Sequence, residues 1–188
     1  MRTFDELWRY ITKERPGVIT VQERSELEHV FNLMRDCDCS SYLEIGTAEG
    51  NSLYVLAQAM VQNASVTYID LWENHTADPR GKVENILDDL NYFLNPIPGD
   101  STEKGTYQRV MDQTYDCVLI DGGHDYTTVL SDAILYAPLA TKYIFFHDIQ
   151  LPEVREAVEW WHKRWQLGKY SEFINSDTFG FGIVEIRK

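Results

Sequence analysis

The chain has 188 residues, of which 44% are hydrophobic, 25% charged and 13% aromatic, a composition typical of a soluble globular protein of one domain. Seventeen Lys and Arg against thirty Asp and Glu leave a formal net charge of -13, which repels phosphate backbones and anionic lipids, so neither nucleic acid nor membrane is expected as a partner. No apolar stretch is long enough to span a bilayer and the N-terminus has no signal pattern, which predicts a cytoplasmic protein.

Two amphipathic helices are predicted in the first forty residues. Apolar side chains recur there at offsets of three, four and seven residues, which place them on one face of a helix. They are Phe4, Leu7, Trp8 and Ile11 in the first helix and Leu27, Val30, Phe31 and Met34 in the second. Arg15-Pro16-Gly17 separates the two helices, because proline lacks an amide proton and glycine tolerates turn dihedrals.

From residue 42 onward, short apolar runs alternate with helical patterns. The runs predict seven strands, at residues 42–45, 66–70, 95–98, 115–121, 142–146, 171–175 and 179–186. The helical patterns between them carry apolar residues over 53–60, 83–90, 107–111, 126–134 and 154–165. Repeated strand-helix units predict parallel pairing, whereas only a short turn containing Asp177 separates the last two strands and predicts an antiparallel pair.

These elements predict one α/β domain over residues 1–188. Residues 1–40 form N-terminal helices, and residues 41–188 form a doubly wound, mostly parallel seven-stranded sheet with helices on both faces and an antiparallel hairpin at its C-terminal end. Ligands of open α/β sheets bind beyond the carboxyl ends of the strands. The residues at which each strand stops are therefore the candidates for a functional site.

The first strand ends in the glycine-containing segment Glu44-Ile45-Gly46-Thr47-Ala48-Glu49-Gly50-Asn51-Ser52. Its glycines allow a tight turn, and the amides at the start of the helix that begins near Asn51 can receive a carboxylate. A dinucleotide-binding loop would have glycine at the positions of Ala48 and Asn51, which disfavours a pyrophosphate ligand. A tight connection without a ligand is the alternative interpretation.

The second and third strands also end in polar residues. Asp70, 24 residues after Gly46, could accept hydrogen bonds from both hydroxyls of a ribose, or it could cap the segment that follows. Gly99-Asp100-Ser101 could hydrogen-bond an adenine edge or cap the next helix. Together, the three consecutive strand ends suit one adenosine-containing ligand that also carries a carboxylate.

The fourth and fifth strands end in carboxylates and imidazoles. Asp121-Gly122-Gly123-His124-Asp125-Tyr126 follows the fourth strand, and His147-Asp148 follows the fifth. Oxygen ligands from Asp121 and Asp148, with His147 as a nitrogen donor, could hold Mg²⁺, Mn²⁺ or Ca²⁺ and leave positions open for substrate oxygens. In the alternative interpretation, Asp125 or Asp148 caps a helix and the histidines bond to nearby loops.

These strand ends resemble those of class I S-adenosylmethionine-dependent methyltransferases, in particular the small-molecule O-methyltransferases related to catechol O-methyltransferase and the antibiotic-sugar methyltransferases. The resemblance spans residues 42–186 and implies a Rossmann-like fold. LEIGTAEGNS is similar to the family's first motif, E-x-G-x-x-x-G-x-S, which implies that Glu44 orients the loop and Ser52 meets the methionine carboxylate. The cofactor-binding residues that the resemblance implies are Glu44, Gly46, Thr47, Ala48, Gly50, Asn51, Ser52, Asp70, Leu71, Asp100, Ser101, Asp121 and Gly122.

VLIDGGHDY and FFHD are similar to the family's fourth- and fifth-strand motifs. In the metal-dependent members, the positions of Asp121, His147 and Asp148 supply the metal ligands, and this sequence departs from them at His147, where a carboxylate is usual. His124 stands where catechol O-methyltransferase has a lysine base, and its unperturbed pKa of about 6.5 suits proton abstraction at neutral pH. His124 and Asp121 are therefore the predicted catalytic residues.

The sequence thus predicts methyl transfer from S-adenosylmethionine to a sugar or aryl hydroxyl of a small-molecule acceptor, with a divalent cation as an optional second cofactor. The alternatives are a metal-assisted hydroxylase or hydrolase on the same fold, and a non-catalytic S-adenosylmethionine- or nucleotide-binding module. The acceptor pocket is expected between the N-terminal helices, the Trp72 to Arg80 loop and the segment after Asp148, where Trp72, His75 and Tyr126 could stack on a ring. The sequence leaves the oligomeric state open, with a homodimer as one option.

Overall fold

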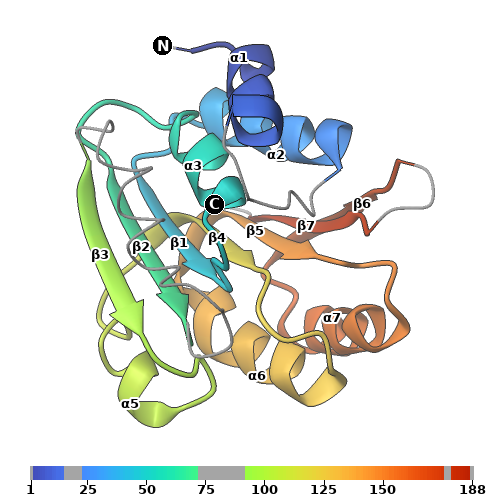
Figure 1. The fold of residues 1–188 in the computed structure, drawn as a ribbon. Coiled ribbons are helices and arrows are strands. Elements are labelled where there is room, and N and C mark those ends of the chain that lie inside the picture. Colours follow the sequence, from blue (N-terminus) through green and yellow to red (C-terminus); the bar gives the residue numbers. More distant parts are fainter. Residues whose placement is uncertain (1, 15–22, 72–91, 176–178, 187–188) are drawn as a thin grey trace.

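The computed structural model describes residues 2–14, 23–71, 92–175 and 179–186. One seven-stranded sheet runs through these residues in the order β3-β2-β1-β4-β5-β7-β6 (Figure 1). Its strands are β1 (Ser41–Ile45), β2 (Ser65–Asp70), β3 (Phe93–Pro98), β4 (Tyr115–Ile120), β5 (Ala140–His147), β6 (Gly168–Phe173) and β7 (Phe181–Ile186). The strands β1 to β5 pair in parallel, and β7 pairs antiparallel with both β5 and β6. The predicted doubly wound sheet with its antiparallel C-terminal pair is confirmed.

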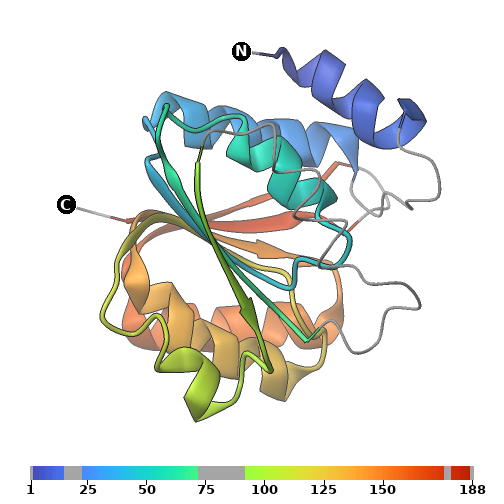
Figure 2. The same ribbon diagram turned by 60° about the vertical axis from the view of Figure 1, so that its left-hand side comes forward.

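Helices cover both faces of the sheet (Figures 1 and 2). One face carries α1 (Phe4–Arg9) with its π-helical continuation η1 (Tyr10–Glu14), α2 (Arg24–Asp36) and α3 (Asn51–Ala57). The other face carries α5 (Lys104–Tyr107), α6 (Tyr126–Tyr136) with the short 3-10 helix η2 (Ala137–Leu139), and α7 (Pro152–Trp165). Among the described helices, none is both long and apolar enough to cross a membrane.

The alternation of side chains along the strands builds a separate core on each face of the sheet. In β1, Tyr42 packs into the core that includes α1, α2 and α3, and its neighbour Leu43 packs into the core that includes α6 and α7. In β4, Cys117 and Val118 divide between the two cores in the same way. Because the central strands β1 and β4 are buried along most of their length, their ends are the parts that a ligand can reach.

Several element bounds differ from the sequence prediction, most of all those of α5 and β6, and β7 begins at Phe181 rather than at residue 179. The helix α5 covers Lys104–Tyr107 rather than residues 107–111, because Asp100 accepts hydrogen bonds from the amide and the hydroxyl of Thr102 and starts the turn earlier. The strand β6 begins at Gly168 and ends at Phe173 rather than covering residues 171–175, because this edge strand alternates polar residues and has no apolar run. The predicted helix over 83–90, the Trp72 to Arg80 loop and the turn at Asp177 lie outside the described residues.

Candidate active site

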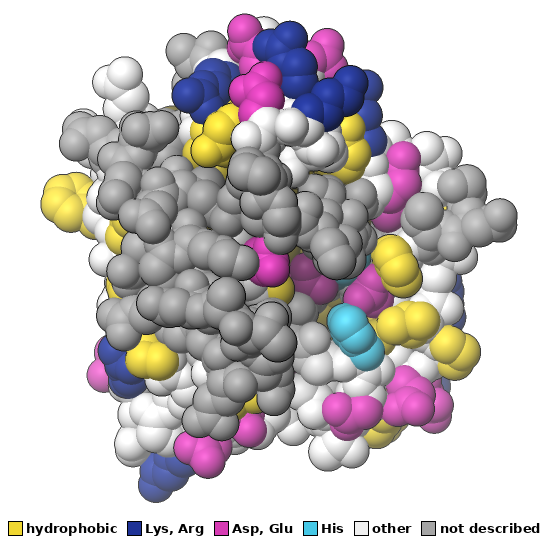
Figure 3. All heavy atoms as spheres, viewed as in Figure 1, with side chains coloured by type: hydrophobic (Ala, Val, Ile, Leu, Met, Phe, Trp, Pro, Cys, Tyr) yellow, Lys and Arg dark blue, Asp and Glu magenta, His cyan; other side chains and the backbone are white. Residues whose placement is uncertain are grey.

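A cavity of about 760 Å³ lies where the parallel strands β1 to β5 end. Most of the residues that the sequence predicts for the site line this cavity. They are Gly46, Thr47, Ala48, Asn51, Ser52, Asp70, Leu71, Asp100, Ser101, Asp121, Gly122, His124, His147 and Asp148. Glu44 and Gly50 belong to the predicted set but not to the cavity wall. In Figure 3, acidic side chains and a histidine gather near the middle of the face shown, with hydrophobic side chains beside them.

The loop between β1 and α3 packs closely against the end of β4. Gly46 has a φ of +83°, and a Cβ there would lie 2.0 Å from the carbonyl oxygen of Asp121. Only glycine fits this position. The amide of Ala48 donates a hydrogen bond to Oδ2 of Asp70 at 2.7 Å, which joins the loop to the end of β2. Contacts to β2 and β4 therefore fix the shape of the loop within the protein itself.

Glu44 lies beneath this loop and is fully buried. The hydroxyl of Tyr42 donates to Glu44 Oε2 at 2.6 Å, and the hydroxyl of Ser52 donates to Oε1 at 2.8 Å. Burial raises the pKa of Glu44 to about 8, although the hydrogen bonds from these hydroxyls act in the opposite direction. Glu44 thus ties the first turn of α3 to β1 from inside the fold.

The turn after β3 is held by α6, which lies on the same face of the sheet as α5. Asp100 Oδ1 accepts hydrogen bonds from the amide of Thr102 at 2.8 Å and from its hydroxyl at 2.7 Å. The hydroxyl of Tyr136 on α6 donates to the carbonyl oxygen of Ser101 at 2.6 Å. These bonds place Asp100 and Ser101 in the same cavity wall as Asp70.

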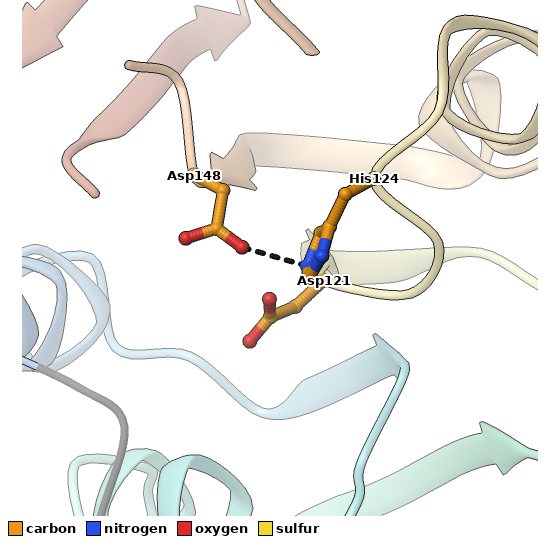
Figure 4. Close-up of side chains that lie close together, drawn as sticks. All are labelled: Asp121, His124 and Asp148. Carbon is orange, nitrogen blue, oxygen red and sulfur yellow. Dashed lines mark ion pairs between the residues drawn. The ribbon is translucent and has the colours of Figure 1, made fainter. Parts of the chain in front are cut away.

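Four side chains from the ends of β4 and β5 form one hydrogen-bonded network. His147 Nδ1 lies 3.0 Å from Asp121 Oδ1 and 3.1 Å from Asp148 Oδ1. His124 Nε2 lies 2.7 Å from Asp148 Oδ2 (Figure 4). The side chains of His147 and Asp148 are buried, whereas that of His124 is 54% exposed. Asp148 also has a φ of +58°, a left-handed conformation whose energetic cost is often found at functional sites.

The network shifts the pKa of three of its members. The hydrogen bond to Asp148 raises the pKa of His124. Burial lowers the pKa of His147, but the charge of Asp121 and the hydrogen bonds to Asp121 and Asp148 outweigh it and raise the pKa to about 10. Burial raises the pKa of Asp148, but the hydrogen bonds from His124 and His147 hold it well below its usual range. Both shifts favour the charged forms, a protonated His147 beside an ionised Asp148.

Asp121, His124 and Asp148 form a group that could hold a metal ion, since one ligand atom from each lies within 4.8 Å of the others. Two carboxylates and one imidazole suit a divalent cation that accepts mixed oxygen and nitrogen ligands. The sequence places His147 in this group instead of His124. In the structure, His147 directs Nδ1 at both carboxylates, and its Nε2 is buried with no hydrogen-bond partner among the described residues. His147 is thus placed to orient the two carboxylates.

Of the two acidic residues after β4 and β5 that could cap a helix, Asp125 is confirmed as a cap. Its Oδ1 accepts hydrogen bonds from the amides of Thr127 and Thr128 at 3.1 Å and begins α6. The N-cap of α7 is Leu151 rather than Asp148. The carboxylate of Asp148 therefore contacts His124 and His147 instead of capping a helix.

Some residues at the cavity were missed by sequence reasoning, and one expected residue is placed elsewhere. Phe179 lines the cavity, although it precedes β7 instead of following a parallel strand. Because β7 is antiparallel, its beginning rather than its end lies at the cavity, so a search of strand ends overlooks it. Tyr126, predicted as a stacking residue, begins α6 and is not part of the cavity wall. Trp72 and His75 lie outside the described residues.

Comparison with solved structures gives matches over nearly the whole chain. A Staphylococcus aureus protein named as a candidate caffeoyl-CoA O-methyltransferase has a TM-score of 0.72 at 20% identity, covering 100% of this chain and 93% of that chain. An O-methyltransferase from Bacillus cereus, in complex with SAH, has a TM-score of 0.68 at 13% identity, with 98% and 90% covered. The O-methyltransferase TomG from Streptomyces achromogenes, in complex with SAM, has a TM-score of 0.67 at 14% identity, with 98% and 89% covered. At these low sequence identities, the similarity shows that the chains share a fold.

Comparison with sequence families gives a more direct assignment. The family model of a methyltransferase domain matches residues 43–149. No curated protein matches the chain. The family match covers more than half of the chain, beginning in β1 and ending just after Asp148, so it contains the strand ends that build the cavity. This chain belongs to the methyltransferase-domain family.

Proposed function

We propose that the protein transfers the methyl group of S-adenosylmethionine to a hydroxyl oxygen of a small-molecule acceptor. The observation that carries the proposal is the shared cavity. The ends of β1, β2 and β3 offer groups suited to an adenosyl ligand with a carboxylate, and the ends of β4 and β5 offer an acid-base network in the same cavity. Donor and acceptor bound at these two ends would lie within reach of each other, which is the main requirement of an in-line transfer.

Each donor-binding role belongs to a residue in the cavity wall. The first amides of α3, near Asn51, suit the methionine carboxylate. Asp70 can accept hydrogen bonds from the ribose hydroxyls while it holds the amide of Ala48, because a carboxylate has about four acceptor sites. Asp100 and Ser101 suit the adenine edge. Three neighbouring strand ends would thus bind one extended ligand.

His124 and Asp148 carry out the acid-base step. When bound, the donor supplies a methyl group whose bond to a positively charged sulfur breaks as the bond to the acceptor oxygen forms, and the electron pair stays on sulfur. Asp148 accepts from Nε2 of His124 and so selects the tautomer with its lone pair on Nδ1. His124 then takes the acceptor's hydroxyl proton at Nδ1, and Asp148 stabilises the resulting imidazolium.

A divalent cation would be held by Asp121, His124 and Asp148 and would lower the pKa of the acceptor hydroxyl. Ligation through Nε2 would replace the hydrogen bond from His124 to Asp148, so this nitrogen cannot serve both arrangements at once. Turnover that survives EDTA supports His124 as the base. Loss of turnover in EDTA with recovery in Mn²⁺ supports His124 as a ligand.

Calorimetry with S-adenosylmethionine and its demethylated product tests the proposal at its first step. We expect both to bind, and we expect Asp70→Asn to weaken binding about tenfold to hundredfold, since a hydrogen bond to a charged group contributes about 1.5–3 kcal/mol. Asp112→Asn is the matched control, because Asp112 is exposed and lies outside the cavity wall. Failure of the unmodified protein to bind either compound would refute the proposal.

The alternative functions predict different products from a donor with a labelled methyl group. Methyl transfer moves the label onto the acceptor. A metal-assisted hydroxylase or hydrolase would change the acceptor without gaining label, and a non-catalytic module would bind the donor and leave the label in place. Family membership favours the first of these outcomes.

A further inference from the structure

Phe179 presents an apolar surface to the acid-base end of the cavity. Its side chain is 43% exposed and forms part of the cavity wall, and its ring centroid lies 6.0 Å from that of His147. The carbonyl oxygen of Phe179 accepts a hydrogen bond from the amide of Gln150 at 3.0 Å, two residues after Asp148. The backbone of Phe179 is thus fixed against the segment that carries the Asp148 carboxylate.

Glu26 on α2 supports this arrangement from inside the protein. It is fully buried, and its two carboxylate oxygens accept hydrogen bonds from two backbone amides, Asn175 after β6 at 3.2 Å and Gly180 before β7 at 3.0 Å. A carboxylate that accepts two amide hydrogen bonds in a buried setting fixes both donors strongly, since charge-assisted bonds are about twice as strong as neutral ones. Glu26 therefore holds the residue directly after Phe179.

The surroundings of Gly180 leave its backbone little freedom to move. Gly180 has a φ of +68°, and a Cβ there would lie 2.8 Å from Cγ1 of Ile174 and 3.1 Å from Cγ2 of Ile149. Its carbonyl oxygen also accepts from the amide of Ile149 at 3.3 Å. The helix α2 also contacts β6 itself, through a stack of the His29 and Phe173 rings at 4.2 Å. The N-terminal helix α2 is thereby coupled to the acceptor end of the cavity.

We infer that Phe179 is a specificity-determining wall of the acceptor site, that Glu26 is the positioning residue that holds it, and that the acceptor is an aromatic hydroxyl compound whose ring stacks on Phe179. The inference rests on the proposed function. A half-exposed phenyl ring beside a polar network gains stabilisation when a flat apolar ligand covers it, and offset or edge-on ring pairs add about 0.5–1.5 kcal/mol beyond the area buried.

The first test compares two probes with adjacent hydroxyls, catechol and cyclohexane-1,2-diol, on protein saturated with S-adenosylhomocysteine. Calorimetry should show tighter binding of catechol. Phe179→Ala should weaken catechol binding about threefold to tenfold, with little effect on the diol, because only the aromatic probe loses a ring contact. Phe93→Ala is the matched control, because Phe93 is 72% exposed on β3 and outside the cavity wall.

The second test asks whether Glu26 acts through Phe179. Glu26→Gln should weaken catechol binding in the same direction and leave the affinity for S-adenosylhomocysteine unchanged. The double variant of Glu26→Gln and Phe179→Ala should bind catechol no more weakly than Phe179→Ala alone, because the two residues form one unit. A general loss of structure would instead weaken both ligands and lower the unfolding temperature.

The outcomes separate the inference about the acceptor site from the proposed function. Equal binding of both probes, no binding of catechol, or an unchanged catechol affinity in Phe179→Ala overturns the inference while S-adenosylhomocysteine still binds. Additive effects in the double variant overturn the role of Glu26. Failure of S-adenosylhomocysteine to bind the unmodified protein counts against the proposed function instead.

Discussion

His124 and Asp148 show how one contact sets both the protonation and the orientation of a candidate base. The 2.7 Å hydrogen bond stabilises the charged imidazole, and for that reason the pKa of His124 is raised. The same network affects folding. The lowered pKa of Asp148 stabilises the fold above its unfolded value of 3.8, and that contribution is lost as the pH falls. The raised pKa of His147 stabilises the fold fully below 6.5, and that contribution is lost as the pH rises toward about 10.

The pH profile of turnover should follow His124. Because the base must be deprotonated and its pKa is raised, kcat/KM should fall as the pH drops through the pKa of His124. Asp148→Asn removes the charge that raises this pKa, so the acidic limb should move to lower pH, and the plateau should fall about tenfold or more because the tautomer is no longer held. Assays in EDTA give the profile without a metal contribution. An acidic limb that stays in place in Asp148→Asn would contradict this assignment of the base.

At the scale of elements, the loop between β1 and α3 is the part that the sequence predicts best. The alternation of apolar runs identifies the parallel strands, and the glycine at the end of β1 marks the turn, because both signals depend on local geometry. The hairpin is predicted less well. The start of β6 and the place of Phe179 depend on pairing with β7, which no local pattern in residues 168–173 records.

Long-range contacts explain what else the sequence could not predict. Glu26 looks like an ordinary acidic residue in the first turn of a helix, yet its partners lie about 150 residues further along the chain. The different roles of His124 and His147 at the cavity also depend on long-range contacts. Both histidines follow or end a strand, and only the packing of β4 beside β5 decides which nitrogen faces which carboxylate.

Substitution of Gly46 tests the close approach of the loop to β4. Gly46→Ala places a Cβ against the backbone of Asp121 at a positive φ, so we expect a loss of about 2–4 kcal/mol in the free energy of unfolding and weaker donor binding. Urea unfolding measures the first effect and calorimetry the second. Gly105→Ala is the control, because a Cβ there meets nothing within 4 Å and α5 tolerates it, with an expected change between zero and about 1 kcal/mol of stabilisation. Equal effects of the two substitutions would contradict the steric argument.

At the scale of the whole molecule, the net charge of -13 creates a field that attracts cations. The carboxylates of Asp70, Asp100, Asp121 and Asp148 in the cavity wall add to this field where the donor would bind. S-adenosylmethionine carries one net positive charge at neutral pH, whereas S-adenosylhomocysteine carries none. The field should therefore favour arrival of the donor over retention of the product.

Salt should affect the two ligands differently. Raising NaCl from about 20 mM to about 300 mM shortens the range of the field, so the association rate constant of S-adenosylmethionine should fall about threefold or more while that of S-adenosylhomocysteine changes little. Stopped-flow fluorescence measures both rates. The neutral product is its own control, because it fills the same cavity without the sulfonium charge. An identical salt dependence for the two ligands would show that steering by charge is absent.

The reversed direction of β7 adds a late stretch of the chain to the wall of the cavity. Most residues suited to the donor come from residues 44–101, whereas the acid-base group comes from residues 121–148, and Phe179 joins it because the antiparallel strand β7 begins where its parallel neighbours end. Acceptor choice can therefore diverge by exchange of residues before β7 without any change to the nucleoside-binding loops. Replacing the residues at this junction would leave S-adenosylmethionine as the donor and change the compound that receives the methyl group.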